Sequence, residues 1–240
     1  MIERLGLNNT IKYLYHQKID RNWNFIAKSK FGFKFKPFTN DGFLFYSGFM
    51  EPKTTKWLKD NIAFYDVFIN VGAGYGEYTM LALAKGVDTI AFEPHPILYN
   101  YLRDNIALNR FQNCHLFQTA IGKSERKSKF ALVDGMTSSH LGGYGRSTRA
   151  ISAEIEVEVM PLTNFSHLFS RYVKPLFLID VERAELEVIR GIPMETLEKS
   201  DLIIETDINN TSLFKFLHRK KCIILEKFSD GFVNYLFLTV

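Results

Sequence analysis

The chain has 240 residues, of which 46% are hydrophobic and 23% charged, and its formal net charge is +4 at pH 7. These values are ordinary for a soluble globular protein that can bury one sizeable core, and no apolar run approaches the roughly 20 residues that span a bilayer. The two cysteines lie in apolar runs without zinc spacing, and the N-terminus lacks a secretory pattern. We therefore expect a cytoplasmic protein without a disulfide framework or structural metal.

The sequence predicts a short N-terminal extension, residues 1–50, in front of one larger domain, residues 51–240. Apolar residues at helical spacing and aromatic residues alternating with lysines indicate the elements of this part of the chain. The predicted elements are a helix around Thr10–Lys18, an alternating segment over Phe31–Lys36, a strand at Phe43–Tyr46 and a helix from Glu51 to Asn61.

From residue 67 onward, short apolar runs alternate with helical segments, which predicts a parallel sheet covered on both faces. The predicted strands are Val67–Val71, Thr89–Phe92, His115–Ile121, Leu176–Ile179 and Leu202–Ile204, and the helices are Glu77–Ala84, Pro96–Asn109, Ala184–Arg190 and Leu213–His218. An extra strand is predicted over Glu154–Leu162, after the long Gly- and Ser-rich connection Asp134–Ala150. Cys222–Leu225 and Tyr235–Leu238 are predicted to form a hairpin that adds antiparallel strands at one edge.

The strongest functional signal is the glycine-rich turn after the first of these strands. Gly72, Gly74 and Gly76 follow GxGxG spacing, and Glu77 takes the position of the third glycine of a dinucleotide site, where a carboxylate would oppose a pyrophosphate. Glu93 ends the next strand, 21 residues after Gly72. A carboxylate in that place accepts hydrogen bonds from ribose hydroxyls. The pattern favours a nucleoside cofactor without phosphate and counts against a dinucleotide-dependent oxidoreductase.

Four segments of the chain resemble a known family: NVGAGYGEYT, AFEPHPILYNYLRDNIALN, TAIG and LIDVERAELEVIRGI. Together they are similar to the FkbM family of class I methyltransferases, over about residues 48–240. The resemblance implies an α/β, Rossmann-like fold with a mostly parallel seven-stranded sheet and a C-terminal antiparallel hairpin. It also implies S-adenosylmethionine (SAM) as methyl donor, and O-methylation of a sugar, glycan or related natural product. The SAM-binding positions that it implies are Asn70, Gly72, Ala73, Gly74, Gly76, Glu93, Pro94, Thr119, Ala120 and Asp180.

A cluster of three acidic residues follows the strand at Leu176–Ile179. The candidate catalytic residues are Asp180, Glu182 and Glu185. Methyl transfer to a hydroxyl benefits from a base that takes its proton, and a carboxylate at a strand end beside the cofactor suits that role. Alternatively, Glu182 and Glu185 only place negative charge at a helix N-terminus. The segment lacks the [DN]-P-P-[YFW] pattern typical of base N-methyltransferases, and we expect no required metal.

The chain departs from the usual family pattern at several positions. These are Asn70 for Asp, Gly74 for Asn, Thr163 for Asp, Leu178 for Lys, and Arg183 within DVERAE where DVEGAE is usual. An arginine at the mouth of the acceptor site would favour an anionic acceptor. The alternative is that Arg183 pairs with Glu187 one helical turn later.

The expected partner is a small-molecule or glycan acceptor, with membrane association only if that acceptor is lipid-linked. Two other functions stay open. An RNA methyltransferase would use Phe31–Lys36 and other basic segments as a stacking surface, although lysines pointing outward from an edge strand give the same pattern. A non-catalytic SAM-binding protein would bind without turnover. His140 is a weaker candidate for a base or acceptor contact, and His95 is predicted to pack near the ribose or to cap a helix.

Overall fold

The computed structural model describes residues 25–37, 39–48, 50–133, 138–144, 150–207, 209–230 and 233–239. The helix predicted around Thr10–Lys18 lies outside these residues. Among the described residues, no helix is both long enough and apolar enough to cross a membrane.

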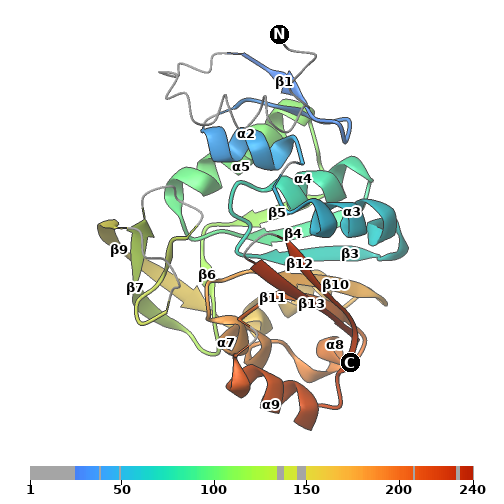
Figure 1. Ribbon diagram of the computed structural model, residues 1–240, viewed down its shortest axis with the longest axis vertical. Helices are drawn as coiled ribbons and strands as arrows, with labels where there is room; N and C mark the ends of the chain where they lie inside the picture. Colours follow the sequence, from blue (N-terminus) through green and yellow to red (C-terminus); the bar gives the residue numbers. More distant parts are fainter. Residues whose placement is uncertain are drawn as a thin grey trace.

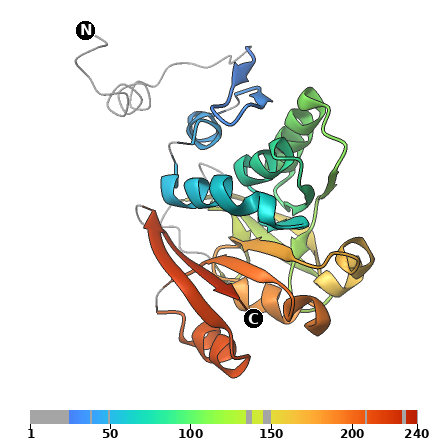
Figure 2. The same cartoon turned by 90° about the vertical axis from the view of Figure 1, so that its right-hand side faces the viewer.

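The described residues contain a central seven-stranded sheet, ordered β12-β13-β11-β10-β3-β4-β5 (Figure 1). Strands β11, β10, β3, β4 and β5 are parallel, and β13 and β12 are antiparallel and extend one edge, red in Figure 2. This confirms the predicted mixed sheet and its C-terminal hairpin. The strands are β3 (Val67–Val71), β4 (Asp88–Phe92), β5 (Cys114–Phe117), β10 (Pro175–Ile179), β11 (Asp201–Glu205), β12 (Ile223–Asp230) and β13 (Val233–Thr239).

Helices cover both faces of this sheet because successive side chains of a strand point to opposite faces. In β3, Val67, Ile69 and Val71 belong to the core cluster shared with α7 and α9, whereas Phe68 belongs to the cluster shared with α3 and α4. Figure 1 shows these two helical layers above and below the sheet. The upper helices are α3 (Pro52–Asn61), η2 (Ile62–Phe64), α4 (Glu77–Ala84) and α5 (Pro96–Asn109), and the lower ones are η3 (Leu162–Phe165), α6 (Ser166–Phe169), α7 (Glu185–Arg190), α8 (Met194–Leu197) and α9 (Thr211–Arg219).

A second sheet, which the sequence did not indicate, lies beside the first. In the described part of the chain it has four strands, ordered β6-β9-β7-β8. The predicted strand His115–Ile121 is divided between the two sheets, because the chain leaves the central sheet after β5 and continues as β6 (Ala120–Ile121). The remaining strands are β7 (Arg126–Val133), β8 (His140–Leu141) and β9 (Ile151–Met160), the last of which corresponds to the predicted extra strand.

The N-terminal extension packs against the larger domain through buried aromatic side chains. The hairpin of β1 (Ala27–Lys28) and β2 (Lys34–Phe35) buries Phe33 and Phe35 and exposes the lysines between and after them, as the alternation predicts. The strand predicted at Phe43–Tyr46 is wrong, because these residues lie in the helix α2 (Asn40–Tyr46). The Thr39 hydroxyl caps this helix by accepting a hydrogen bond from the Gly42 N–H.

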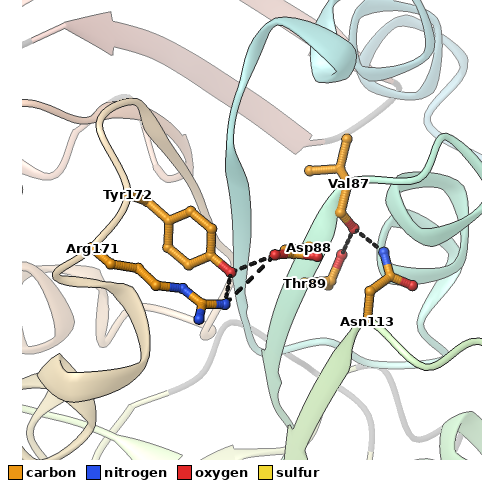
Figure 3. Close-up of polar contacts among 6 residues, drawn as sticks. All are labelled: Val87, Asp88, Thr89, Asn113, Arg171 and Tyr172. Atoms are coloured by element: carbon orange, nitrogen blue, oxygen red, sulfur yellow. Dashed lines mark hydrogen bonds and ion pairs between the residues drawn. The ribbon is translucent and has the colours of Figure 1, made fainter.

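Polar contacts tie the N-terminal ends of the parallel strands together at the edge of the sheet opposite the site (Figure 3). The Tyr172 hydroxyl donates to the Asp88 carboxylate at the start of β4 at 2.6 Å, and the Arg171 guanidinium donates to the Tyr172 hydroxyl at 2.7 Å. Asn113 donates to the Val87 carbonyl oxygen at 2.9 Å. These bonds hold the loop after α6 against the sheet and leave the carboxyl edge of the strands for the functional site.

Candidate active site

A cavity of ≈ 440 Å³ lies at the carboxyl ends of β3, β4, β10 and β11. In open α/β sheets this is the edge at which ligands bind. Most of the predicted site residues meet here, although they come from distant parts of the sequence. Gly72, Ala73, Gly74, Glu93, Pro94, Thr119, Ala120, Asp180 and Glu182 line the cavity, together with His140, whereas Asn70, Gly76 and Glu185 lie outside its lining.

The three glycines of the turn after β3 have different reasons to be glycine, although all have positive φ. A Cβ on Gly72 would lie 1.8 Å from the Asp180 carbonyl oxygen, and one on Gly76 would lie 2.2 Å from Leu102. A Cβ on Gly74 would meet no atom within 4 Å, and its N–H donates to Glu93 at 2.6 Å. Gly72 and Gly76 therefore serve packing, while Gly74 leaves a cradle in which a ligand can approach the backbone.

Glu93 is buried at the end of β4, with only 4% of its surface exposed. One carboxylate oxygen accepts from the Gly74 N–H and the other accepts from the His95 N–H at 2.7 Å. Burial raises its pKa to about 7, and these two backbone hydrogen bonds oppose that rise. Each carboxylate oxygen has a second lone pair, so the pair of oxygens still suits a ribose diol. The His95 ring caps α5, as predicted, by accepting from the Ile97 N–H.

Two predicted cofactor residues form structural bonds around the cavity. The Thr119 hydroxyl donates to the Glu158 carbonyl oxygen at 2.9 Å, which joins β9 to the lining. Asn70 donates from its amide to the Thr79 hydroxyl at 3.0 Å and so ties β3 to α4. Its side-chain oxygen is buried and has no hydrogen-bond partner among the described residues.

Three further carboxylates line the cavity: Glu51, Glu77 and Glu205. The sequence did not single them out as ligand-contacting residues. Glu205 ends the apolar strand β11 in the way that Asp180 follows β10, so the same signal was present in the sequence. Nothing comparable marks Glu51, whose carboxylate accepts hydrogen bonds from the Tyr78 and Tyr235 hydroxyls. A cavity lined by this many carboxylates suits a ligand that carries positive charge, as SAM does on its sulfonium and amino groups.

Glu77 begins α4, and burial, followed by repulsion from Glu51, raises its pKa from 4.5 to about 8. Because the folded-state pKa lies above the unfolded one, folding favours the protonated form and the protein loses stability as the pH rises from about 4.5 to 8. Glu77→Gln removes this cost. We expect Glu77→Gln to be more stable than the wild type by about 1–2 kcal/mol at pH 8 and by little at pH 4.5. The gain at pH 8 is smaller than the full pKa shift implies, because solvent reaches part of this half-buried side chain and screens its charge.

Urea unfolding at the two pH values measures this difference. The matched control is Glu195→Gln on the exposed start of α8, for which we expect the same small effect at both. A Glu77→Gln advantage that does not grow with pH would contradict the assignment.

The acidic motif after β10 forms a tight turn. Glu182 and Arg183 both have positive φ, of 52° and 81°, and Glu185 accepts the Arg183 N–H at 2.7 Å from a fully buried position at the start of α7. The alternative in which Arg183 pairs with Glu187 is wrong, because Glu187 pairs with Arg126 at 2.8 Å. The Arg183 guanidinium lies 3.8 Å from the Asp207 carboxylate, and Arg183 does not line the cavity.

The match to a protein-family model agrees with this geometry. A model of the Methyltransferase FkbM domain matches residues 70–236. Among solved structures, the chain is similar to precorrin-6y C5,15-methyltransferase from Geobacter metallireducens, with a TM-score of 0.48, 11% identity, and 78% of this chain and 87% of that one covered. It is also similar to a ribosomal protein L11 methylase from Lactobacillus delbrueckii, with a TM-score of 0.44, 12% identity, and coverages of 79% and 83%.

A search of curated protein sequences finds no match. The matched family domain begins at Asn70 and ends at Leu236, so it contains the glycine turn, Glu93 and the acidic motif as well as the central sheet. The chain therefore belongs to the FkbM methyltransferase family and is a class I, SAM-dependent methyltransferase.

Proposed function

We propose that this methyltransferase transfers the methyl group of SAM to a hydroxyl group of a sugar, a glycan or a related natural product. The observation that carries the proposal is Asp180, which stands at the carboxyl end of β10, lines the cavity and abuts the glycine turn. Burial, and then repulsion from and hydrogen bonding to Glu205, raise the pKa of Asp180 well above its ordinary value. A carboxylate with a raised pKa is a stronger base toward a hydroxyl proton.

The residues of the cavity divide the work between the donor and the acceptor. SAM, when bound, supplies a methyl group activated by its sulfonium. The cradle at Gly74 and the carboxylate of Glu93 would hold the nucleoside part, and the wall at Thr119 and Ala120 would face its base. Asp180 would orient the acceptor hydroxyl and take its proton, because alignment of the nucleophile contributes much of the rate in such a displacement.

The charge of the acceptor remains a separate proposal, and an anionic acceptor rests on Arg183 alone. Six of the described residues that line the cavity are Glu or Asp and none is Lys or Arg. This lining gives an anionic group little support, so a neutral hydroxylated acceptor fits it better.

RNA as acceptor is less well supported. The aromatic residues Phe33 and Phe35, which would have to stack on bases, are at most 2% exposed and pack against Tyr46. Binding to RNA that weakens steeply with salt would favour this alternative.

Two measurements test the proposal in sequence. Calorimetry with SAM and with its demethylated product shows whether the protein binds the donor. Transfer of labelled methyl groups to matched neutral, acidic and amino sugars, with and without EDTA, then defines the acceptor. Transfer to a hydroxyl without a metal requirement supports the proposal. Donor binding without transfer to any hydroxylated acceptor would favour the non-catalytic alternative, and activity lost in EDTA would overturn the expectation that no metal is needed.

Arg183 gives a prediction about the turn itself. Its φ of 81° lies in the left-handed region, which costs a residue with a side chain about 1–2 kcal/mol. Arg183→Gly should therefore raise stability by about 1 kcal/mol, or the melting temperature by about 2–4 °C. The half-exposed pair with Asp207 contributes little in comparison. Arg183→Ala is the control, because it loses the guanidinium and keeps the backbone strain. Equal melting temperatures of the two variants would show that the backbone at residue 183 is not strained.

A further inference from the structure

Two carboxyl groups from neighbouring strands meet at the cavity. Asp180 follows β10 and Glu205 ends β11, and these strands are parallel with Ile179 paired to Ile204. The register therefore brings the two strand ends side by side. Both side chains line the cavity, Glu205 is buried, and a charge on Glu205 repels one on Asp180. Two buried carboxyl groups at adjacent strand ends repel each other when both are charged, so a state in which one of them holds a proton is favoured.

The groups around this pair make a second negative charge costly. Asp180 faces Glu51 at the start of α3 and Glu182 in its own turn, and both repel a charge on it. Tyr235 on β13 and Tyr78 on α4 donate their hydroxyls to Glu51 and so do not neutralise the pair. The described lining of the cavity supplies no Lys or Arg. This arrangement favours one proton shared by Asp180 and Glu205 while no cation is bound nearby.

The pair also lies against the predicted donor site. The Asp180 carbonyl oxygen is so close to Gly72 that a Cβ there would be 1.8 Å away, and the Asp180 N–H donates to the Val71 carbonyl oxygen at 3.0 Å. Asp180 is thus fixed to the turn in which the donor would sit. A positive charge bound at that turn acts directly on the proton of the pair.

We propose that Glu205 is a positioning residue whose shared proton makes the base Asp180 dependent on the charge of the methyl donor. The proposal rests on the proposed function. The pair would release its shared proton to solvent when the sulfonium charge is bound beside it, and Asp180 would then be able to accept the proton of the acceptor hydroxyl. The new oxygen–carbon bond then forms as the carbon–sulfur bond breaks and its electron pair returns to sulfur. Sulfur becomes neutral, and the proton taken from the acceptor restores the pair.

The test needs no acceptor, because it counts protons on binding. Calorimetry at pH 7 in phosphate and in Tris, whose ionisation heats differ, gives the number of protons released by SAM and by its demethylated product, which lacks the sulfonium charge. We expect SAM to release at least about half a proton more than the product. In Glu205→Gln this excess should fall severalfold, because the amide holds no exchangeable acid proton. In the matched variant Glu182→Gln most of it should remain.

The outcomes distinguish failure of this proposal alone from failure of the proposed function. Equal proton release by the two ligands in the wild type overturns the shared proton and leaves the proposed function standing. This measurement does not depend on the folding of any variant. A Glu205→Gln protein that binds both ligands and keeps the full excess also overturns the shared proton. If Glu205→Gln does not fold, Asp180→Asn serves in its place and should lose the excess. A wild type that binds no SAM overturns the proposed function and this proposal together.

Discussion

Gly72→Ala is expected to lower the free energy of unfolding by about 3 kcal/mol or more, which is the largest effect that we predict for a single methyl group. The added Cβ would lie 1.8 Å from the Asp180 carbonyl oxygen, which is backbone and cannot rotate away. The φ of 81° at Gly72 adds strain for any residue with a side chain. The ends of β3 and β10 would have to separate, and with them the two halves of the cavity.

Urea unfolding measures this loss, and Gly74→Ala is the matched control in the same turn. Gly74 also has a positive φ, of 57°, but its Cβ would meet no atom within 4 Å. We therefore expect Gly74→Ala to cost only about 1 kcal/mol in stability, while its methyl group enters the space that the donor needs and weakens SAM binding. Equal stability of the two variants would show that β3 and β10 are not packed as closely as the structure indicates.

Much of the central sheet could be predicted because its strands are buried on both faces. Such strands appear as uninterrupted apolar runs, as in Val67–Val71 and Pro175–Ile179. The bounds of α5 matched the prediction because Pro96 starts the helix, and Leu98 and Leu102 follow at helical spacing on its buried side. The site followed from the same property, because the residue after each apolar run lies at the ligand-binding edge.

The errors arise where tertiary contacts decide the structure. Phe43 and Phe45 are two positions apart, a spacing that favours a strand, but Thr39 caps a helix there and the Tyr46 hydroxyl donates to the Tyr75 carbonyl oxygen. The strand β7 was missed because its first half is polar and alternates between half-buried and exposed residues. Its register with β9 is stabilised by exposed pairs such as Lys127 with Glu156, which no local pattern reveals.

The sequence identifies individual carboxylates at strand ends but does not show which of them lie next to each other. Asp180 was identified from its own strand, and Glu205 follows from the same rule applied to β11. That the two carboxyl groups meet at the cavity depends on the pairing of β10 with β11 in the sheet, which is a property of the fold. The chemistry that we infer for Asp180 therefore depends on the pairing of strands that are separate in the sequence.

Glu93→Ala is expected to weaken SAM binding at least about a hundredfold, measured by calorimetry. Two hydrogen bonds from ribose hydroxyls to a buried carboxylate account for about 3 kcal/mol. The same oxygens accept the Gly74 and His95 N–H groups, so the variant also loosens the cradle and lowers stability. Loss of binding alone would not distinguish a direct contact with ribose from a distorted turn.

A donor analogue without the ribose 2′-hydroxyl makes that distinction. If Glu93 binds the ribose, the wild type should lose at least about tenfold in affinity on removal of the hydroxyl, because a buried charged acceptor loses its donor. Glu93→Ala should bind the two ligands almost equally, since a contact that is already gone cannot be lost again. A variant that still discriminates as strongly as the wild type would move the ribose away from Glu93. The end of β4 would then act only by holding the glycine turn.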